Sequence, residues 1–511
     1  MKNIKKFLLV MLSVLLVVTP MSACKKTAYI DEESIIQGVD EETGSETVGE
    51  TDNTSNGETS GETSGGTSGG PSGGQGSKIE TGNTGTSGNS GNQSTGKIDD
   101  NIKIKEGKTP VENGVNYGGK TLVYLSAWDP NSEDVKEFEK TYNCKLDIRK
   151  VNFNLYAQQA AALVNSGTKI DIGYIFSGHY PQVLISGLWQ PLQDHFTTAD
   201  LVNTNDTNKN GIDLEKSKQF SWNKNLYGVT YYYSTYTGVL FYNKKLVNDF
   251  GAKDPMDYYK AGNWNYNTLR EFAASVTDAN SNIWFGAIAM YSGWLQSNNT
   301  GYIKYVNGVP TENMSDPAVF EALKLVRDMS VGQNKVLGDV GNDARDAFLK
   351  GKTVAYKDFM SDSSVLRAKA ASSEAFGKNA DNVGRVLLPT GPNNTDNVPT
   401  VAGIEAFGSS IGSQHPEAAI LWAKLLGKNT KARYIKSWNL NDADWNMFME
   451  EPLKKTLPRP YGGFATSSTS MNTIASEIES KVYLGTDITS LLNRYRTQVR
   501  NCINVSMKQQ G

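Results

Sequence analysis

The feature that most constrains the fold of this chain is a long polar tract that cannot form a structure alone. Residues 43–96 contain 16 glycines in 54 positions and no aromatic residue. Such a composition buries too little apolar surface to offset the cost of ordering the backbone, about 1–2 kcal/mol per residue. We therefore expect a disordered tether over residues 24–114. The rest of the chain, residues 115–511, is long enough for a substantial core and two domains.

The first 23 residues have the pattern of an export signal. Lysines at positions 2, 5 and 6 precede an apolar run over residues 7–18. That run is shorter than the about 20 residues that a membrane-spanning helix needs. A basic head, a short apolar core and small residues before a cleavage point are typical of a signal peptide, which we assign to residues 1–23. The body is therefore expected to be extracytoplasmic.

The end of this signal, Met21-Ser22-Ala23-Cys24, resembles the lipobox of bacterial lipoproteins. The resemblance implies cleavage before Cys24 and a lipid on its sulfur; an ordinary secretion signal with a chance cysteine is the alternative. A flexible coil of about 90 residues spans on the order of 50 Å. Such a coil would hold the body clear of the membrane, on the outer face of a bacterial cell.

Charge and cysteine content narrow the classes of partner. The chain has 51 basic and 54 acidic residues and no basic stripe, so nucleic acid is not an expected partner. With Cys24 lipidated, Cys144 and Cys502 remain in a compartment where disulfides persist. Sequence cannot show that residues 358 positions apart meet. Two unpaired, buried thiols are the favoured interpretation.

No metal site or cofactor is predicted. The three histidines lack the spacing of metal ligands. Residues 206–211 (DTNKNG) begin like a calcium loop, with oxygen-bearing side chains at positions 1, 3 and 5. Position 12 of that loop would be Ser217, not a glutamate. A polar surface loop is favoured, and a weak calcium site stays open.

The body begins with alternating strand and helix patterns. Strands are predicted at 120–126, 144–151 and 171–176, and helices at 131–142, 156–165 and 181–186. This alternation indicates a parallel sheet with helices on both faces. Ligands of such sheets bind beyond the carboxyl ends of the strands. Here those ends lead into loops that carry Trp128 and Asp129, and His179 and Tyr180.

Two strings imitate catalytic motifs. Residues 408–412 (GSSIG) match G-x-S-x-G, but a nucleophile elbow needs a helix that starts at the serine, and the next helix is predicted from Pro416. Gly351-Lys352-Thr353 lacks the earlier glycine of a P-loop, since Asp346 stands there. Neither string predicts an enzyme.

Several segments of the body occur in the order found in one known family. They are LVYLSAW at 122–128, VKEFEKTYNCKLDI at 135–148, GLWQPL at 187–192, YGV at 227–229, VLFYNKKL at 239–246, NWNYNTLREF at 263–272, AFLKGKTVA at 347–355, RVLLP at 385–389 and HPEAAILWAKLL at 415–426. Together they resemble the extracellular solute-binding proteins of ABC importers, the family 1 sugar-binding type. The resemblance covers most of residues 118–500.

The resemblance implies an α/β, two-lobe periplasmic-binding-protein-like fold of type II, with a ligand cleft between the lobes. Lobe 1 is expected at 115–233 and 385–428, and lobe 2 at 234–384 and 429–511. The implied function is capture of a carbohydrate, specifically an oligosaccharide, for an ABC permease, by a monomer without catalysis. The alternatives are a binding protein for another solute, such as a polyamine, and a surface glycan hydrolase or adhesin.

Aromatic residues mark the expected cleft, because Tyr and Trp join an apolar face to a polar tip and so suit sugars. The run YYYSTY at 231–236 falls where the family's first crossing between lobes lies. Asp358 and Phe359 are expected to follow a strand at 353–357. The predicted ligand contacts are Trp128, Asp129, His179, Tyr180, Tyr232, Tyr236, Trp294, Asp358, Phe359 and Glu405. Trp189, Trp264 and Trp422 are assigned to the core or lobe surface.

Overall fold

A computed structural model describes residues 101–205, 209–287, 293–340, 343–396, 401–453 and 461–508. The predicted signal peptide, Cys24 and the tether up to residue 100 lie outside the described residues. Lipidation and tethering by these residues therefore stay predictions. Residues 101–114, expected as the end of the tether, instead contact the body: the Val111 amide donates to the Asp200 carboxylate at 2.7 Å, and Glu112 pairs with Lys424.

The strands are short except for those at the centre of the main sheet. They are β1 (Lys120–Ser126), β2 (Cys144–Lys150), β3 (Ile172–Phe176), β4 (Ser221–Trp222), β5 (Asn225–Leu226), β6 (Thr235–Asn243), β7 (Gly286–Ala287), β8 (Ile303–Val306), β9 (Val309–Glu312), β10 (Leu337–Gly338), β11 (Ala355–Phe359), β12 (Val383–Leu387) and β13 (Val401–Gly408).

The helices lie between and after these strands. They are α2 (Ser132–Tyr142), α3 (Tyr156–Asn165), α4 (Gln182–Ile185), α5 (Leu214–Ser217), α6 (Lys244–Asp249), α7 (Pro255–Lys260), α8 (Tyr266–Ser275), α9 (Trp294–Ser297), α10 (Pro317–Ser330), α11 (Ala344–Leu349), α12 (Ser363–Ala370), α13 (Glu417–Trp438), α14 (Asp442–Trp445), α15 (Glu451–Leu453), α16 (Met471–Tyr483) and α17 (Ile488–Lys508). Shorter turns used below are η2 (Phe153–Leu155), η3 (Ser177–His179) and the π-helical η9 (Asn446–Glu450).

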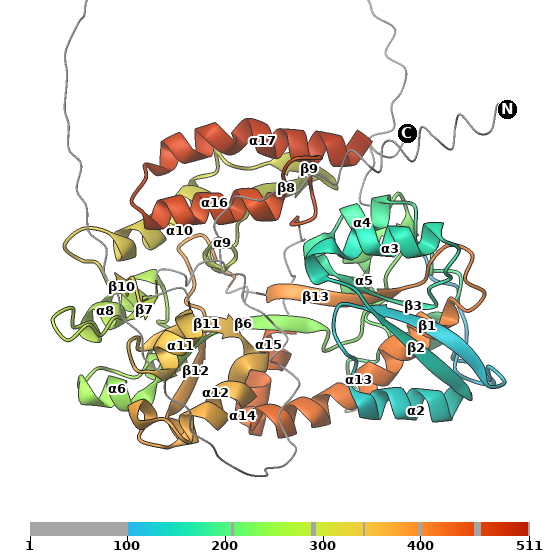
Figure 1. Ribbon diagram of the computed structural model, residues 1–511, viewed down its shortest axis with the longest axis horizontal. Helices are drawn as coiled ribbons and strands as arrows, with labels where there is room; N and C mark the ends of the chain where they lie inside the picture. Colours follow the sequence, from blue (N-terminus) through green and yellow to red (C-terminus); the bar gives the residue numbers. More distant parts are fainter. Residues whose placement is uncertain are drawn as a thin grey trace, which may run out of the picture. The chain divides into compact units, whose positions relative to one another are not determined.

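The main sheet has the order β11-β6-β13-β3-β1-β2, with β12 also paired to β6. As predicted, β1 runs parallel to both β2 and β3. The other pairs, which sequence patterns did not resolve, are antiparallel. Two strands change neighbours along their length. β6 pairs first with β13 and then with β12, whereas β13 pairs first with β6 and then with β3. Because of this exchange, β6 and β13 connect the β1–β3 side of the sheet to the β11–β12 side (Figure 1).

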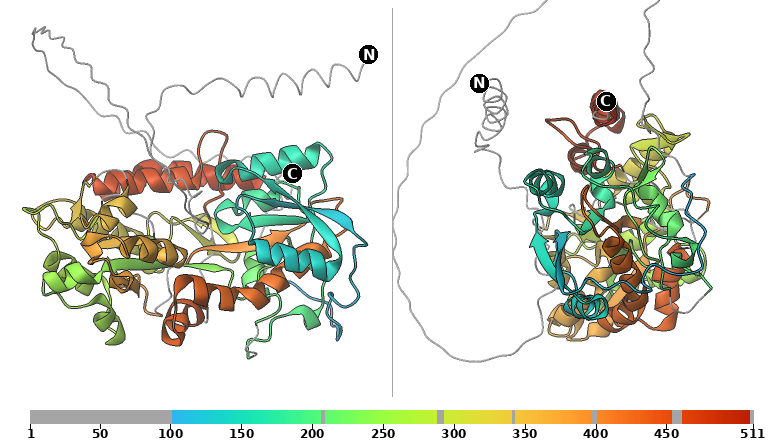
Figure 2. Two further views of the ribbon diagram at one scale, coloured as in Figure 1. Left: turned by 60° about the horizontal axis from the view of Figure 1, so that its bottom comes forward. Right: turned by 90° about the vertical axis from the view of Figure 1, so that its right-hand side faces the viewer.

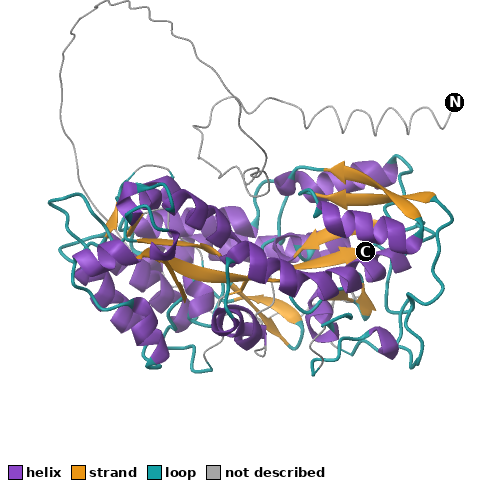
Figure 3. Ribbon diagram, turned by 90° about the horizontal axis from the view of Figure 1, so that it is seen from below, coloured by secondary structure: helices purple, strands orange, loops and turns teal. Residues whose placement is uncertain are grey.

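Helices cover both faces of the β1–β3 side, as expected (Figure 1, Figure 3). On one face, Tyr124 meets Trp422 of α13 at 5.1 Å between ring centroids, and Phe138 of α2 packs beside them. On the other face, Leu125 packs in a cluster with Tyr156 of α3. Successive strand residues thus serve opposite faces, which is the period of two that made the strands predictable.

The predicted boundaries of the first two helices are confirmed to within one residue, and capping residues define those of α2. The Asn131 side chain accepts hydrogen bonds from the Glu133 and Asp134 amides at the start of α2. Asn143 ends that helix in the left-handed conformation, with φ of 52°. Helix α3 covers the predicted residues 156–165, and Gly167 follows with φ of +94°.

A second hydrophobic cluster is built around α8, α10, α16 and α17. The two C-terminal helices, red in Figure 2, pack on each other. Trp264 is 5% exposed in this cluster, and its Nε1 donates to the Leu387 carbonyl at 2.7 Å. Trp189 and Trp422 are also buried, so all three assignments to the core or lobe surface are confirmed as core.

The lobe boundaries stay predictions. Two features bear on them. Strand β12, which the proposed boundary at 385 divides, pairs with β6 over its whole length. Helix α13 continues past residue 428 to Trp438. Within the described part of the chain, no helix combines the length and apolar character needed to cross a membrane.

Candidate ligand-binding site

Five aromatic side chains form a continuous row, here called the aromatic row. Trp128 stacks on Phe153, with 4.9 Å between ring centroids and 15° between planes. Phe153 lies 5.5 Å from Phe176, Phe176 lies 6.1 Å from Tyr236, and Tyr236 lies 6.1 Å from Phe359. All five side chains are half-buried. Half-buried rings keep part of an apolar face available to a ligand, and aromatic faces suit the C–H faces of sugars.

The sheet topology explains why these residues meet. Trp128 follows β1 and Phe176 ends β3, and the carboxyl ends of parallel strands share an edge. Tyr236 lies near the start of β6, and Phe359, at the end of the antiparallel β11, pairs with Gly238 of β6. The row therefore passes from the β1–β3 side to the β11 side at the strands that connect them.

Gly403 of β13 is needed at the centre of this arrangement. It pairs with Tyr236 at a register irregularity between β13 and β6. A Cβ atom at this position would lie 2.2 Å from Cζ of Phe176. A side chain at position 403 would thus displace the ring of Phe176 from the row.

His179 of η3 lies beside Phe153 and Phe176, the second and third members of the aromatic row. Its ring is 4.5 Å from that of Phe153 and stacks on Tyr156 at 5.3 Å. Burial lowers the pKa of His179 to about 4, although the Phe153 carbonyl oxygen, 3.0 Å from Nε2, favours the charged form. The ring is therefore neutral near pH 7, and Nε2 carries the proton because it faces a carbonyl acceptor.

Glu405 of β13 is buried next to the row and pairs with Phe176 in the sheet register. Its carboxylate accepts hydrogen bonds from the Tyr231 hydroxyl and, at 3.0 Å, from the Tyr236 hydroxyl. Burial raises the pKa of Glu405 even though both donors oppose the shift. A buried carboxylate in this position fixes the orientation of the Tyr236 ring.

Asp358 and Phe359 occupy the last two positions of β11, which corrects the expectation that they follow a strand at 353–357. Pairing with Val239 and Gly238 of β6 extends the strand through them. The half-buried Asp358 accepts a hydrogen bond from the Tyr356 hydroxyl.

A second carboxylate lies close to Asp358. Arg345 lies 2.7 Å from Asp362 and 3.9 Å from Asp358. Burial, reinforced by the charge of Asp358, raises the pKa of Asp362 to about 7. The Arg345 guanidinium therefore pairs with two carboxyl groups beside the Phe359 end of the row.

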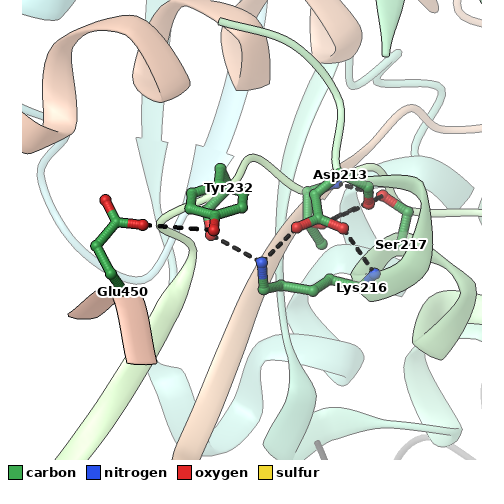
Figure 4. A network of polar contacts seen from close by, with 6 residues as sticks. Asp213, Lys216, Ser217, Tyr232 and Glu450 are labelled. Carbon is green, nitrogen blue, oxygen red and sulfur yellow. Dashed lines mark hydrogen bonds and ion pairs between the residues drawn. The ribbon is translucent and has the colours of Figure 1, made fainter. Parts of the chain in front are cut away.

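Four predicted contacts lie away from the aromatic row. Tyr180, Tyr232 and Trp294 are buried, at 0%, 7% and 5% exposure. Tyr232 contacts Lys216 and Glu450 instead (Figure 4). Asp129 is exposed and pairs with Lys150 at 2.9 Å. The three buried rings would have to become exposed to touch a ligand, and all four assignments stay predictions.

Sequence reasoning missed Phe153 and Phe176. Phe176 was assigned to the third strand and Phe153 to no element, so neither was considered for the site. The available signal was their position, since each lies at or just after the carboxyl end of a strand. Phenylalanine also lacks the polar tip that directed attention to Tyr and Trp.

The catalytic string G-x-S-x-G has a structural role here. The Ser410 Oγ accepts a hydrogen bond from the Ile170 amide at 2.8 Å, and the Ser409 Oγ donates to the Ile170 carbonyl. Both serines are fully buried, and helix α13 begins at Glu417, one residue after the predicted start, with Pro416 as its N-cap. The geometry of a nucleophile elbow is absent from this described segment.

The cysteine and metal predictions have different outcomes. Cys144 and Cys502 are buried and unpaired, as favoured from sequence. Residues 206–208 of the possible calcium loop lie outside the described residues. In the parts of the chain that are described, no group of three or more His, Cys, Asp and Glu side chains is arranged to hold a metal ion.

The family assignment follows from comparison with known proteins. The bacterial extracellular solute-binding protein family matches residues 130–432, more than half of the chain, and the chain therefore belongs to this family. The family resemblance seen in the sequence is thus confirmed. A search of curated proteins found no match.

Solved structures with the same architecture support the fold. The ABC substrate-binding protein Lmo0181 of Listeria monocytogenes, complexed with cycloalternan, is 17% identical with a TM-score of 0.55 over 76% of this chain and 99% of that one. The lacto-N-biose complex of the galacto-N-biose/lacto-N-biose I-binding protein of Bifidobacterium longum is 12% identical, with a TM-score of 0.55 over 76% and 98%. The GacH receptor of Streptomyces glaucescens, studied unliganded and with acarbose, is 14% identical, with a TM-score of 0.54 over 76% and 99%. The expected two-lobe α/β fold is confirmed.

Proposed function

We propose that this chain is the substrate-binding protein of an ABC importer and that its ligand is a carbohydrate, specifically an oligosaccharide. The observation that carries the proposal is the aromatic row, which combines half-buried rings from both sides of the connecting strands. Similar folds in the three relatives named above hold or recognise sugars. A row of several rings suits a ligand of several sugar units better than a single one.

The polar groups around the row support the same ligand class. The Tyr236 hydroxyl donates to Glu405, so its orientation is set before a ligand arrives. The Asp358 carboxylate beside Phe359 is half-buried. Fixed polar groups among apolar rings are the usual composition of a small-molecule site. We assign no reaction to this site, in keeping with the solute-binding family.

The proposal extends to location and partners. Cleavage before Cys24 and lipidation of its sulfur would anchor the chain to the outer face of the cell membrane. The part of the predicted tether that precedes residue 101 would let the body reach the permease subunits that receive the ligand. The two lobes, at 115–233 with 385–428 and at 234–384 with 429–511, would close on the ligand as a monomer.

A thermal-shift screen of mono- and oligosaccharides, with polyamines as the comparison class, tests this proposal. A ligand at 100 times its Kd adds about 2.7 kcal/mol to the free energy of unfolding. We expect oligosaccharides to raise the melting temperature of the full chain and polyamines to leave it unchanged. Stabilisation by a polyamine and by no sugar would assign the site to a different solute.

A further inference from the structure

The four tyrosines of residues 231–236 divide between two carboxylates on two other segments. Tyr231 and Tyr236 donate to Glu405 of β13. Tyr232 and Tyr233 instead donate to Glu450 of η9, at 3.4 Å and 2.8 Å. One short run at the start of β6 is therefore bound to the second connecting strand and to a segment near the C-terminus.

The Glu450 contacts form a compact polar group, here called the tyrosine clasp, made of Tyr232, Tyr233 and Glu450. Trp445 Nε1 also donates to the Glu450 carboxylate at 2.9 Å, and its ring lies 4.9 Å from that of Tyr233. Burial opposes ionisation of Glu450, yet donation by Trp445 and Tyr233 lowers its pKa below the ordinary value. The clasp therefore uses an ionised acceptor, which makes hydrogen bonds stronger than a neutral one does.

The buried Lys216 holds the Tyr232 end of the clasp in place (Figure 4). Lys216 Nζ donates to the Tyr232 carbonyl at 2.9 Å and lies 4.5 Å from the centroid of the Tyr232 ring. Asp213 pairs with the same ammonium group and accepts from the Lys216 amide. Lys209 lies 5.1 Å from the ring centroid. The position of Tyr232 is thus determined by α5 and the residue before it.

The clasp is directly followed by the strand that carries the aromatic row. Tyr236 is three residues beyond Tyr233, and the Thr237 Oγ1 donates to the Phe448 carbonyl of η9 at 3.0 Å. None of the described contacts of Glu450 involves a residue of the row. Glu450 is therefore linked to the row through Tyr233, which leads into β6, and through η9, whose Phe448 carbonyl binds Thr237 of β6.

We propose that Glu450 is a positioning residue for the binding site: the tyrosine clasp holds the start of β6 where Tyr236 joins the two halves of the aromatic row. The inference rests on the proposed function. A ligand that binds the joined row must restore it when the clasp is lost. The apparent Kd then equals the intrinsic Kd divided by the fraction of molecules that remain in the competent conformation.

The experiment uses the full chain with Tyr233→Phe, Glu450→Gln, and Tyr302→Phe as the matched control. Tyr302 is fully buried, and its hydroxyl has no hydrogen-bond partner among the described residues. Hydrogen exchange of the amides of residues 235–238 is measured without ligand. We expect faster exchange there in both clasp variants, with no change in α16 and α17 and none in the control.

Calorimetry with the best oligosaccharide from the screen gives the second readout. We expect each clasp variant to raise Kd about threefold or more and the control to leave it unchanged. The double variant should match Glu450→Gln, because Tyr233 acts through that carboxylate. Unchanged exchange and unchanged Kd in both clasp variants would overturn the proposal. If no sugar binds the wild type, the proposed function fails, and the exchange data alone decide on the clasp.

If Glu450→Gln does not fold, Tyr233→Phe retains the ring packing on Trp445 and decides the question by itself. A general loss of stability would speed exchange in all segments alike. Such uniform acceleration would also count against a positioning role, because the clasp acts on one strand.

Discussion

The aromatic row and the hydrophobic cluster around α8, α10, α16 and α17 each contain a tryptophan that was predicted from the sequence to contact the ligand. Trp128 is half-buried and stacks on Phe153. Trp294 begins α9 and is 5% exposed within the cluster, where its carbonyl accepts a hydrogen bond from the Tyr266 hydroxyl. The same residue type thus stands in two different environments. The exposed fraction of the side chain, which the sequence does not give, therefore separates a binding role from a packing role.

The largest expected effect concerns the buried tryptophan. Trp294→Ala should lower the free energy of unfolding by about 3–5 kcal/mol, because a large apolar side chain is lost from a packed core. Thermal and denaturant unfolding of the full chain measure this change. An unaltered free energy of unfolding would mean that Trp294 does not serve packing and would favour its predicted contact with the ligand.

The next effect concerns His179, which lies beside Phe153 and Phe176 of the row. Its pKa is about 4 in the folded chain and near 6.5 when unfolded, so below pH 6.5 the unfolded state binds the extra proton first. This contribution therefore lowers stability as pH falls from 6.5 to 4, by up to about 3 kcal/mol at 1.36 kcal/mol per pKa unit. Unfolding of wild type and His179→Gln across this range measures it. Parallel stability curves for the two proteins would show that His179 is not buried in the neutral form.

Glu405 should give a dependence of the opposite sign. Burial raises its pKa above 4.5, so the folded state retains a proton that the unfolded state loses. Its contribution to stability is present below pH 4.5 and is lost as pH rises through the folded pKa. Comparison of wild type with Glu405→Gln from pH 4 upward checks this, and a difference that is constant with pH would contradict it.

The smallest effect concerns the partner of Trp128. Phe153→Leu keeps an apolar side chain but removes a stacked ring, which is worth about 0.5–1.5 kcal/mol beyond buried area. We expect sugar affinity to fall by roughly twofold to tenfold at 1.4 kcal/mol per decade, with little change in melting temperature. A lowered melting temperature with normal affinity would place Phe153 in the packing class with Trp294.

Local patterns carried most of what could be predicted about the fold. Strand β1 and helix α3 have the predicted bounds because alternation, capping and a terminating glycine are local properties. Strand β11 was placed two residues too early, since its end depends on pairing with β6, which is distant in sequence. The parallel core was predictable, whereas the exchange of neighbours by β6 and β13 was not.

Two of the predicted site residues, Trp128 and His179, follow strand ends, whereas Tyr236 and Glu405 lie within strands and were predicted from the family resemblance. Trp128, His179, Tyr236, Phe359 and Glu405 meet at or beside the aromatic row, and Asp358 precedes Phe359. The tyrosine run was recognised, but not its division between Glu405 and Glu450. That division depends on η9, which is more than 200 residues away in the sequence.

Calorimetric titration of one oligosaccharide into Trp128→Ala, Trp294→Ala and wild type decides whether carbohydrate binds at the aromatic row. Truncation of an aromatic anchor costs about 2 kcal/mol or more, roughly thirtyfold in Kd. We predict that loss for Trp128→Ala, at nearly wild-type stability, and near-normal affinity for the folded fraction of Trp294→Ala. Wild-type affinity in Trp128→Ala together with lost affinity in folded Trp294→Ala would contradict a carbohydrate site at the aromatic row.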